Sequence, residues 1–263
     1  MSLRHLLALV LITASSVLPA KDKADPVMTS EEKNQATAVA ALGKLIFEHD
    51  RAAALATDEL SSIGLRSDKR VRGWVTEPTD HGITVTVVGL TEGSTPAALY
   101  SVKTDQSGTP IGSPIKNPEP IALTDTQMAL YQARSNALKS TFEPCSKSYN
   151  TVALATDSGI SVYLLPGTTD SNVVPIGGTY KVDYDQKGEK LLETRGYTKS
   201  CIALQKDEKS VGMMITHLLD SFPTEVHVYW SLWANSPMYV GIVQNKNLWA
   251  VSEGNLRLVV RGK

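Results

Sequence analysis

The longest hydrophobic pattern in the chain predicts an α-helix over residues 29–63. Apolar residues recur there at helical intervals, Thr29 and Glu32 have the spacing of a capping box, and Gly64 ends the pattern. Many members of the apolar stripe are alanines, which favours close packing on another surface. His49 falls on the same stripe, and we interpret it as a packing residue and not as a ligand.

Shorter segments of alternating apolar and polar residues follow this helix and predict β-strands. They occupy residues 71–76, 83–90 and 97–103, and turn-forming residues separate them. Residues 105–122 come next, with four prolines and little periodicity. We therefore predict that this proline-rich segment connects two parts of the chain.

The rest of the sequence predicts a helix, a series of antiparallel strands, another helix and three final strands. The helices are expected to begin at Thr124 or Asp125 and at Thr224, and to end before Pro144 and Pro237. The strands are expected at residues 150–156, 160–165, 178–185, 190–193, 197–204, 212–216, 238–243, 248–251 and 256–260. This order is typical of an α+β fold and not of a doubly wound sheet.

The first twenty residues have the pattern of a secretory signal peptide. A short basic start with Arg4 and His5 precedes an uncharged run from Leu6 to Val17, and Ala20 precedes a polar segment. The uncharged run is shorter than the roughly twenty residues that a membrane-spanning helix needs. We predict cleavage after Ala20, export to the periplasm or beyond, and a mature chain without a membrane span.

Together these patterns divide the chain into four parts. They are a signal peptide, a helix with a small sheet, a proline-rich connection and a C-terminal α+β domain, at residues 1–20, 21–104, 105–122 and 123–263.

Composition narrows the classes of partner. Apolar residues make up 42% of the chain and charged residues 20%, which is typical of a globular protein with a buried core. Without the predicted signal peptide, 25 basic and 27 acidic residues remain, a net charge of −2. The mature chain therefore has no basic excess with which to bind nucleic acid or an anionic membrane surface.

Cys145 and Cys201 are the only cysteines in the sequence. In an oxidising compartment such a pair most simply forms one disulfide. Closing a loop of about 57 residues would stabilise the fold by about 4 kcal/mol in the chain-entropy model. The alternative is a redox-active or nucleophilic thiol, but the CxxC spacing of many redox sites is absent.

Sequence motifs for catalysis are absent apart from one segment with two histidines. GxSxG, HExxH and a phosphate-binding loop before a helix do not occur. In residues 213–251 a predicted strand ends at His217, Pro223 opens a helix, and His227 falls on the first turn of that helix. Two histidines so placed, with a carboxylate, are a candidate zinc site.

This order of elements resembles the JAB/MPN metalloprotease family. The resemblance implies a zinc ion that lowers the pKa of a bound water, held by two histidines and an aspartate. His217 matches the second histidine, His227 stands at the aspartate position and Thr224 at the serine position. Ile215 replaces the first histidine, and the position of the catalytic glutamate falls near residues 149–150, which cannot act as a base.

Both histidines and the aromatic run beside them also have a structural interpretation. His217 and His227 could hydrogen-bond the loop and the helix start. Tyr229, Trp230 and Trp233 could form an interface, because Tyr and Trp are enriched in binding hot spots. A helix that is apolar on most sides is more often buried between layers, and we favour burial.

Three functions remain open at this stage. The C-terminal half is similar to uncharacterised exported proteins of the xanthomonad type, on the segments CSKSYNTVAL, VYLLPGTT and PTEVHV. We favour a non-catalytic periplasmic protein that binds another protein or an envelope component. The alternatives are a zinc hydrolase that uses His217 and His227, and an inhibitor or immunity protein against a secreted toxin.

Overall fold

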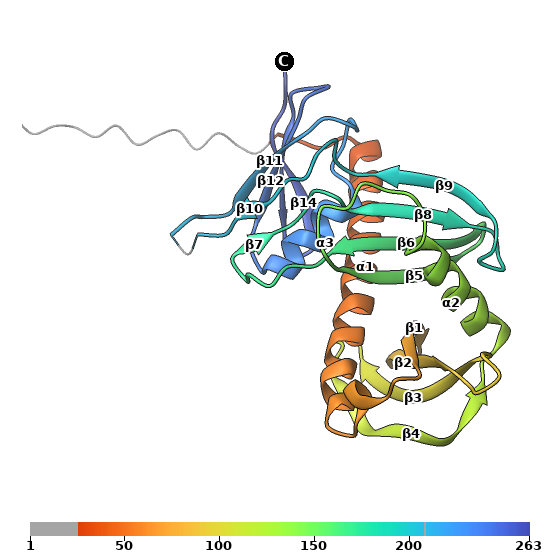
Figure 1. Ribbon diagram of the computed structural model, residues 1–263. Coiled ribbons are helices and arrows are strands. Elements are labelled where there is room, and N and C mark those ends of the chain that lie inside the picture. The colour runs from red at the N-terminus through yellow and green to blue at the C-terminus, as the bar shows by residue number, and fades with distance from the viewer. Residues whose placement is uncertain (1–25, 208) are drawn as a thin grey trace, which may run out of the picture.

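The computed structural model describes residues 26–207 and 209–263 of the chain, which form an α+β fold (Figure 1). The helices are α1 (Ser30–Ser61), α2 (Asp125–Ala137) and α3 (Glu225–Ala234), with a short 3-10 turn, η1 (Leu65–Ser67). The strands are β1 (Val71–Thr79), β2 (Gly82–Leu90), β3 (Pro96–Asp105), β4 (Pro110–Ala122), β5 (Tyr149–Thr156), β6 (Gly159–Pro166), β7 (Val173–Val174), β8 (Tyr180–Tyr184), β9 (Leu191–Gly196), β10 (Leu204–Gln205), β11 (Met213–His217), β12 (Met238–Ile242), β13 (Leu248–Ser252) and β14 (Asn255–Val260). The predicted signal peptide and its cleavage site lie outside the described residues.

Helix α1 begins and ends as the sequence predicts. The Thr29 hydroxyl accepts a hydrogen bond from the Glu32 backbone N–H at 3.1 Å, and the Thr29 N–H donates to the Glu32 carboxylate at 2.8 Å. This reciprocal pair is a capping box. Gly64 follows the helix with a φ of 96°, a conformation that glycine adopts without steric cost.

Strands β1 to β4 form the N-terminal sheet, an antiparallel meander in sequence order. The prediction that residues 105–122 are a connection is wrong, because residues 110–122 are strand β4, paired with β3. Proline lacks an N–H, so it is tolerated where one side of a strand is unpaired. Strand β4 is such an edge strand, and its prolines hide its strand character in the sequence.

The central sheet has the antiparallel order β5-β6-β8-β9, and α2 packs on one of its faces. The C-terminal sheet has the order β11-β12-β13-β14. In this last sheet β11 and β12 are parallel and α3 connects them, whereas the other pairs are antiparallel. A parallel pair needs such a crossover, so the predicted order strand, helix, strand agrees with the observed topology.

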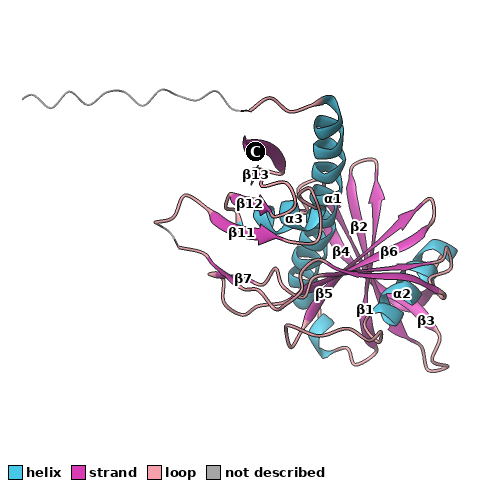
Figure 2. Cartoon of the chain, turned by 90° about the horizontal axis from the view of Figure 1, so that it is seen from above, coloured by secondary structure: helices cyan, strands magenta, loops and turns pink. Residues whose placement is uncertain are grey.

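Helix α1 joins these layers instead of belonging to one of them. The half of α1 that contains Ile46 shares a core with α3, the central sheet and the C-terminal sheet. The half that contains Ala56 and Leu60 shares a core with the N-terminal sheet. Figure 2 shows α1 between β11 and β12 on one side and the strands of the other two sheets on the other. The predicted parts at 21–104 and 123–263 therefore do not have separate cores.

Helices α1 and α3 approach closely at Gly43. A Cβ atom on Gly43 would lie 2.4 Å from the Cβ of Val228, which no ordinary contact allows. The backbone of α1 therefore packs directly on α3 at this point, as the small residues of the stripe predict.

The predicted disulfide is present between Cys145 and Cys201, with Cα atoms 5.3 Å apart. The prediction of a strand over 197–204 is wrong for most of that segment, which is irregular, and strand β10 contains residues 204 and 205 alone. The disulfide therefore holds a loop in place. Gly178 allows this loop to close, because a Cβ atom there would lie 2.5 Å from the Cβ of Cys145. A disulfide is typical of an oxidising compartment. Within the described residues no helix is long and apolar enough to cross a membrane.

Candidate functional site

The structure brings His217 and His227 together. His217 is the last residue of β11 and His227 lies on the first turn of α3, and both are buried. Their rings meet edge to face, with centroids 4.7 Å apart. The two histidines that the sequence singles out therefore lie in one polar cluster.

His227 completes the N-terminal cap of α3. Its Nδ1 atom accepts a hydrogen bond from the Thr224 backbone N–H at 3.0 Å and lies 3.0 Å from the Thr224 hydroxyl. Burial, and then the nearby His217, lower the pKa of His227 to about 3. His227 is therefore neutral near pH 7, and because Nδ1 is the acceptor, the ring proton is on Nε2. A ring in this state offers no free lone pair to a metal ion.

His217 is held by a carboxylate that also binds an arginine. Its Nε2 atom lies 2.8 Å from Asp220 Oδ2. Arg195 on β9 donates from Nη2 to both oxygens of Asp220, at 2.8 and 2.7 Å. The Arg195 guanidinium also lies over the ring of Tyr197, 4.7 Å from its centroid. Asp220 thus links β11, β9 and the loop before α3.

Glu225 receives two phenol hydroxyls in the same cluster. Tyr163 donates to Glu225 Oε1 at 3.2 Å, and Tyr197 donates to the same oxygen. Burial, and then the charge of Glu225, raise the pKa of both tyrosines well above the usual range, so both stay protonated and act as donors. No local pattern in the sequence indicates these contacts, because Tyr163 and Glu225 are 62 residues apart.

A groove of about 410 Å³ adjoins this cluster on the face of the central sheet that looks toward α1. Two rows of side chains cross this face. Ser161, Asp183 and Glu193 lie opposite one another on β6, β8 and β9. Tyr163, Lys181 and Arg195 form the neighbouring row on the same strands. The first row therefore contains two acidic side chains, Asp183 and Glu193, and the second contains two basic ones, Lys181 and Arg195.

Contacts within the rows confirm that these side chains share one face. Ser161 donates to Asp183 at 2.6 Å, and Lys181 lies 3.0 Å from Asp183. Leu42 of α1 and Leu192 of β9 also line the groove. The groove is therefore polar along its floor and apolar where α1 and β9 border it.

A second cavity, of about 600 Å³, lies between the start of α2 and the turns that join β5 to β6 and β8 to β9. Met128 and Ile160 give it apolar walls, and Asp125, Lys187 and Glu189 line it with charge. It does not share a lining residue with the histidine cluster.

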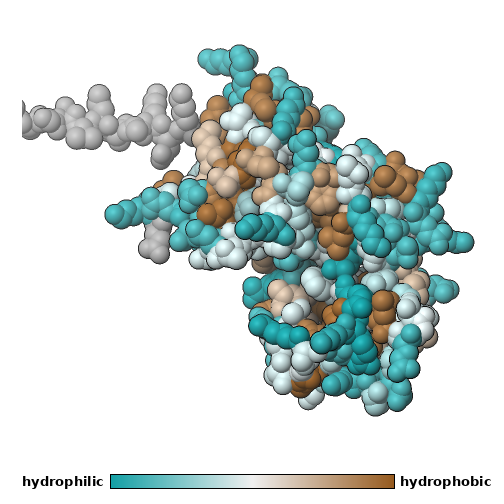
Figure 3. Space-filling view, viewed as in Figure 1, coloured by the Kyte–Doolittle hydropathy of each residue, from teal (hydrophilic) through white to brown (hydrophobic). Residues whose placement is uncertain are grey.

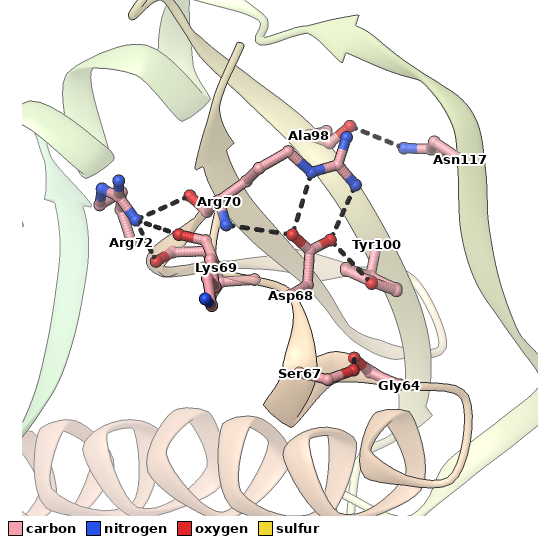
Figure 4. Close-up of polar contacts among 10 residues, drawn as sticks. Gly64, Ser67, Asp68, Lys69, Arg70, Arg72, Ala98, Tyr100 and Asn117 are labelled. Atoms are coloured by element: carbon pink, nitrogen blue, oxygen red, sulfur yellow. Dashed lines mark hydrogen bonds and ion pairs between the residues drawn. The ribbon is translucent and has the colours of Figure 1, made fainter. Parts of the chain in front are cut away.

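A cluster at the start of β1 has a structural role (Figure 4). Arg70 donates to both oxygens of Asp68, and the Tyr100 hydroxyl donates to Asp68 at 3.0 Å. These hydrogen bonds hold the pKa of Asp68 well below its usual range, and the bond from Arg70 has the largest effect. The cluster fastens the segment after η1 to strand β3.

The aromatic run on α3 is largely buried. Tyr229 and Trp230 are each 1% exposed, and both belong to the largest core. The interface interpretation is therefore wrong for these two residues, because they fill the space between α1, α3 and the sheets. Trp233 is partly buried and lines a shallow cavity with Thr168 and Lys206.

His49 is buried as predicted, and its environment predicts acid sensitivity. Its Nδ1 atom lies 2.7 Å from the Thr76 hydroxyl, and its buried Nε2 has no hydrogen-bond partner. Burial lowers the pKa of His49 to about 4, so the folded protein keeps it neutral while the unfolded chain protonates it near pH 6.5. Its contribution to stability is complete above pH 6.5 and is lost as the pH falls toward 4.

We therefore expect His49→Asn to flatten the pH dependence of stability. Asparagine retains a polar group for Thr76 but does not titrate. Between pH 7 and pH 5 the parent should lose about 2 kcal/mol more unfolding free energy than the variant. Urea unfolding at both pH values measures this difference, and equal losses in the two proteins would show that His49 does not cause it.

Comparisons with known proteins give no relative. No family model matches the chain, and neither a curated protein nor a solved structure is significantly similar to it. The resemblances to the JAB/MPN family and to xanthomonad-type exported proteins stay predictions.

Proposed function

We propose that this chain is an exported protein that binds another protein or an envelope component, and that it uses the groove of the central sheet to do so. One observation carries the proposal. The ionisable groups next to the groove bond one another: His217 pairs with Asp220, Asp220 with Arg195, and Glu225 with two tyrosines. Because these groups are bonded to one another, they stabilise the protein beside the groove. We therefore place the contact with a partner in the groove itself.

The groove has the properties of a contact surface. Side chains such as Lys181 and Asp183 are about one quarter exposed, at 28% and 22%. Leu192 is 51% exposed at the border. A mixture of apolar and charged groups around a concave floor is typical of recognition sites. The predicted signal peptide and the disulfide support a location outside the cytoplasm.

Site-specific photocrosslinking in the native cell tests this function. A photoreactive amino acid at Ser158, an exposed residue that lines the groove, should give an adduct with a defined envelope protein or component. The same amino acid at Lys139, exposed near the end of α2, is the matched control and should not give it. Absence of an adduct at Ser158, or the same adduct from both positions, would contradict the proposal.

A zinc hydrolase is the second candidate, favoured by the contact between His217 and His227. The residues present fit a zinc ion poorly, because His227 Nδ1 accepts from Thr224 and its Nε2 carries the ring proton, so neither nitrogen of His227 offers a lone pair. In the part of the chain that the structure describes, no group of three or more histidine, cysteine, aspartate or glutamate side chains is placed to hold a metal. The third possibility, inhibition of a secreted toxin, is one form that binding in the groove could take.

We expect residues 21–263, produced in an oxidising compartment and equilibrated with zinc, to retain well below one zinc ion per chain. Elemental analysis by mass spectrometry measures this, with His217→Ala and His227→Ala as controls. Zinc close to one ion per chain in the parent and lost in both variants would instead support the hydrolase.

A further inference from the structure

Strand β9 is an exposed edge without the prolines that protect β4, and its two charged residues, Glu193 and Arg195, have opposite signs. Edge strands invite pairing with another chain, and proteins block them with proline, charge or a covering segment. Strand β4 contains Pro110, Pro114, Pro118 and Pro120, whereas β9 contains no proline. Residues 191–194 of β9 are exposed, and β9 is the last strand of the central sheet at its outer edge (Figure 1).

We propose that two copies of this chain associate through β9 in antiparallel register, with the two-fold axis at Thr194. The four strands of each central sheet would then form one continuous sheet of eight. In this register Glu193 pairs with Arg195 of the second copy, and Thr194 pairs with Thr194. Opposite charges and threonine pairs are both favourable across antiparallel strands. This inference does not depend on the proposed function.

The charge rows of the groove determine this register. A row of one copy that ends in Asp183 and Glu193 continues into Arg195 and Lys181 of the second copy. The two-fold axis generates the same arrangement a second time, with the acidic row of the second copy next to the basic row of the first. A shift of one residue would place Glu193 opposite Thr194 and lose the complementarity, since cross-strand partners must share a face.

Side-chain geometry allows these pairs to form. Arg195 bonds Asp220 through Nη2, and a guanidinium has five N–H donors, so Arg195 has other N–H groups for Glu193 of the second copy. Glu193 is exposed, as are Leu191 and Leu192, at 49% and 51%. Figure 3 shows apolar residues among the polar ones on the surface of the upper part of the molecule, which includes β9. Pairing at β9 would remove part of this apolar surface from water.

A cysteine at the two-fold axis tests the register directly. In Thr194→Cys the two cysteines of a dimer would have Cα atoms about 4.5–5.5 Å apart, within reach of a disulfide. We expect mild oxidation to give a covalent dimer in high yield. Leu192→Cys is the control, because residue 192 would pair with residue 196 and its two copies would be about 13 Å apart along the strands.

Charge reversal tests the contacts without a covalent bond. In sedimentation experiments on residues 21–263, Glu193→Lys should raise the dimer dissociation constant about tenfold or more, because two attractive pairs become repulsive. Glu189→Lys makes the same change of charge in the turn before β9 and should leave the constant unchanged.

Two results would overturn the inference. One is a parent protein that stays monomeric at every concentration. The other is a dimer that neither forms the Thr194→Cys crosslink nor responds to Glu193→Lys, which would place the interface elsewhere. Neither result would affect the Ser158 adduct, so the two proposals can fail separately.

Discussion

Replacing Cys145 and Cys201 with serine is expected to lower the free energy of unfolding by about 4 kcal/mol. The disulfide joins residues 56 positions apart, and its loss frees a long loop in the unfolded chain. The segment around Cys201 also has little regular secondary structure of its own. Urea unfolding of the parent and of the double variant at pH 7 measures the difference.

A reducing agent provides the control for this prediction. It should destabilise the parent to about the level of the double serine variant and leave that variant unchanged. A double variant as stable as the oxidised parent would show that the loop is held by other contacts, such as the hydrogen bond from the Cys145 backbone N–H to the Tyr149 hydroxyl at 2.8 Å.

Trp230→Ala is expected to cost about 3–5 kcal/mol of unfolding free energy. Trp230 lies in the largest core, and its indole N–H donates to the Thr179 hydroxyl at 3.0 Å. The change would leave a cavity between α3 and the central sheet, and the Thr179 hydroxyl would lose the donor that it accepts from, although it would still donate to the Ile176 carbonyl. Chemical denaturation of the variant and the parent gives the difference.

Trp233→Ala is the matched control, because it removes the same side chain one turn later on α3. Trp233 is partly buried, so its loss should cost clearly less than that of Trp230. Equal costs for the two variants, or a larger cost at Trp233, would contradict the burial that the structure gives to Trp230.

Local patterns in the sequence predict most of the elements correctly. The helix starts at Thr29, Thr124 and Thr224 are where the sequence places them, because a cap depends on residues three positions apart. The alternating strands from Ile83 and from Ile160 are also confirmed. These signals depend on neighbours in the sequence and need no knowledge of the fold.

Pairing between distant strands is what the sequence does not predict. The prolines of β4 conceal a strand in the sequence. Whether a strand tolerates a proline depends on which of its N–H groups must bond the neighbouring strand, here β3, and that pairing is not visible in the sequence. The charge rows of the groove exist only through the registers of β6, β8 and β9. His217 and His227 can be recognised as a pair in the sequence because they are close together in it. Arg195 and the two tyrosines that bind Glu225 cannot, because only the fold brings them there.

The position of α1 has a consequence for the order in which the chain can fold. Tyr229 on α3 donates to Asp50 on α1 at 2.8 Å, across 179 residues of sequence. A chain that emerges from its N-terminus therefore presents the half of α1 that contains Ile46 long before α3 arrives to cover it. Contacts at such separation slow folding, since the loop must close before they form. A newly made chain would thus remain open in this region, and dependent on protection from aggregation, until most of its length has emerged.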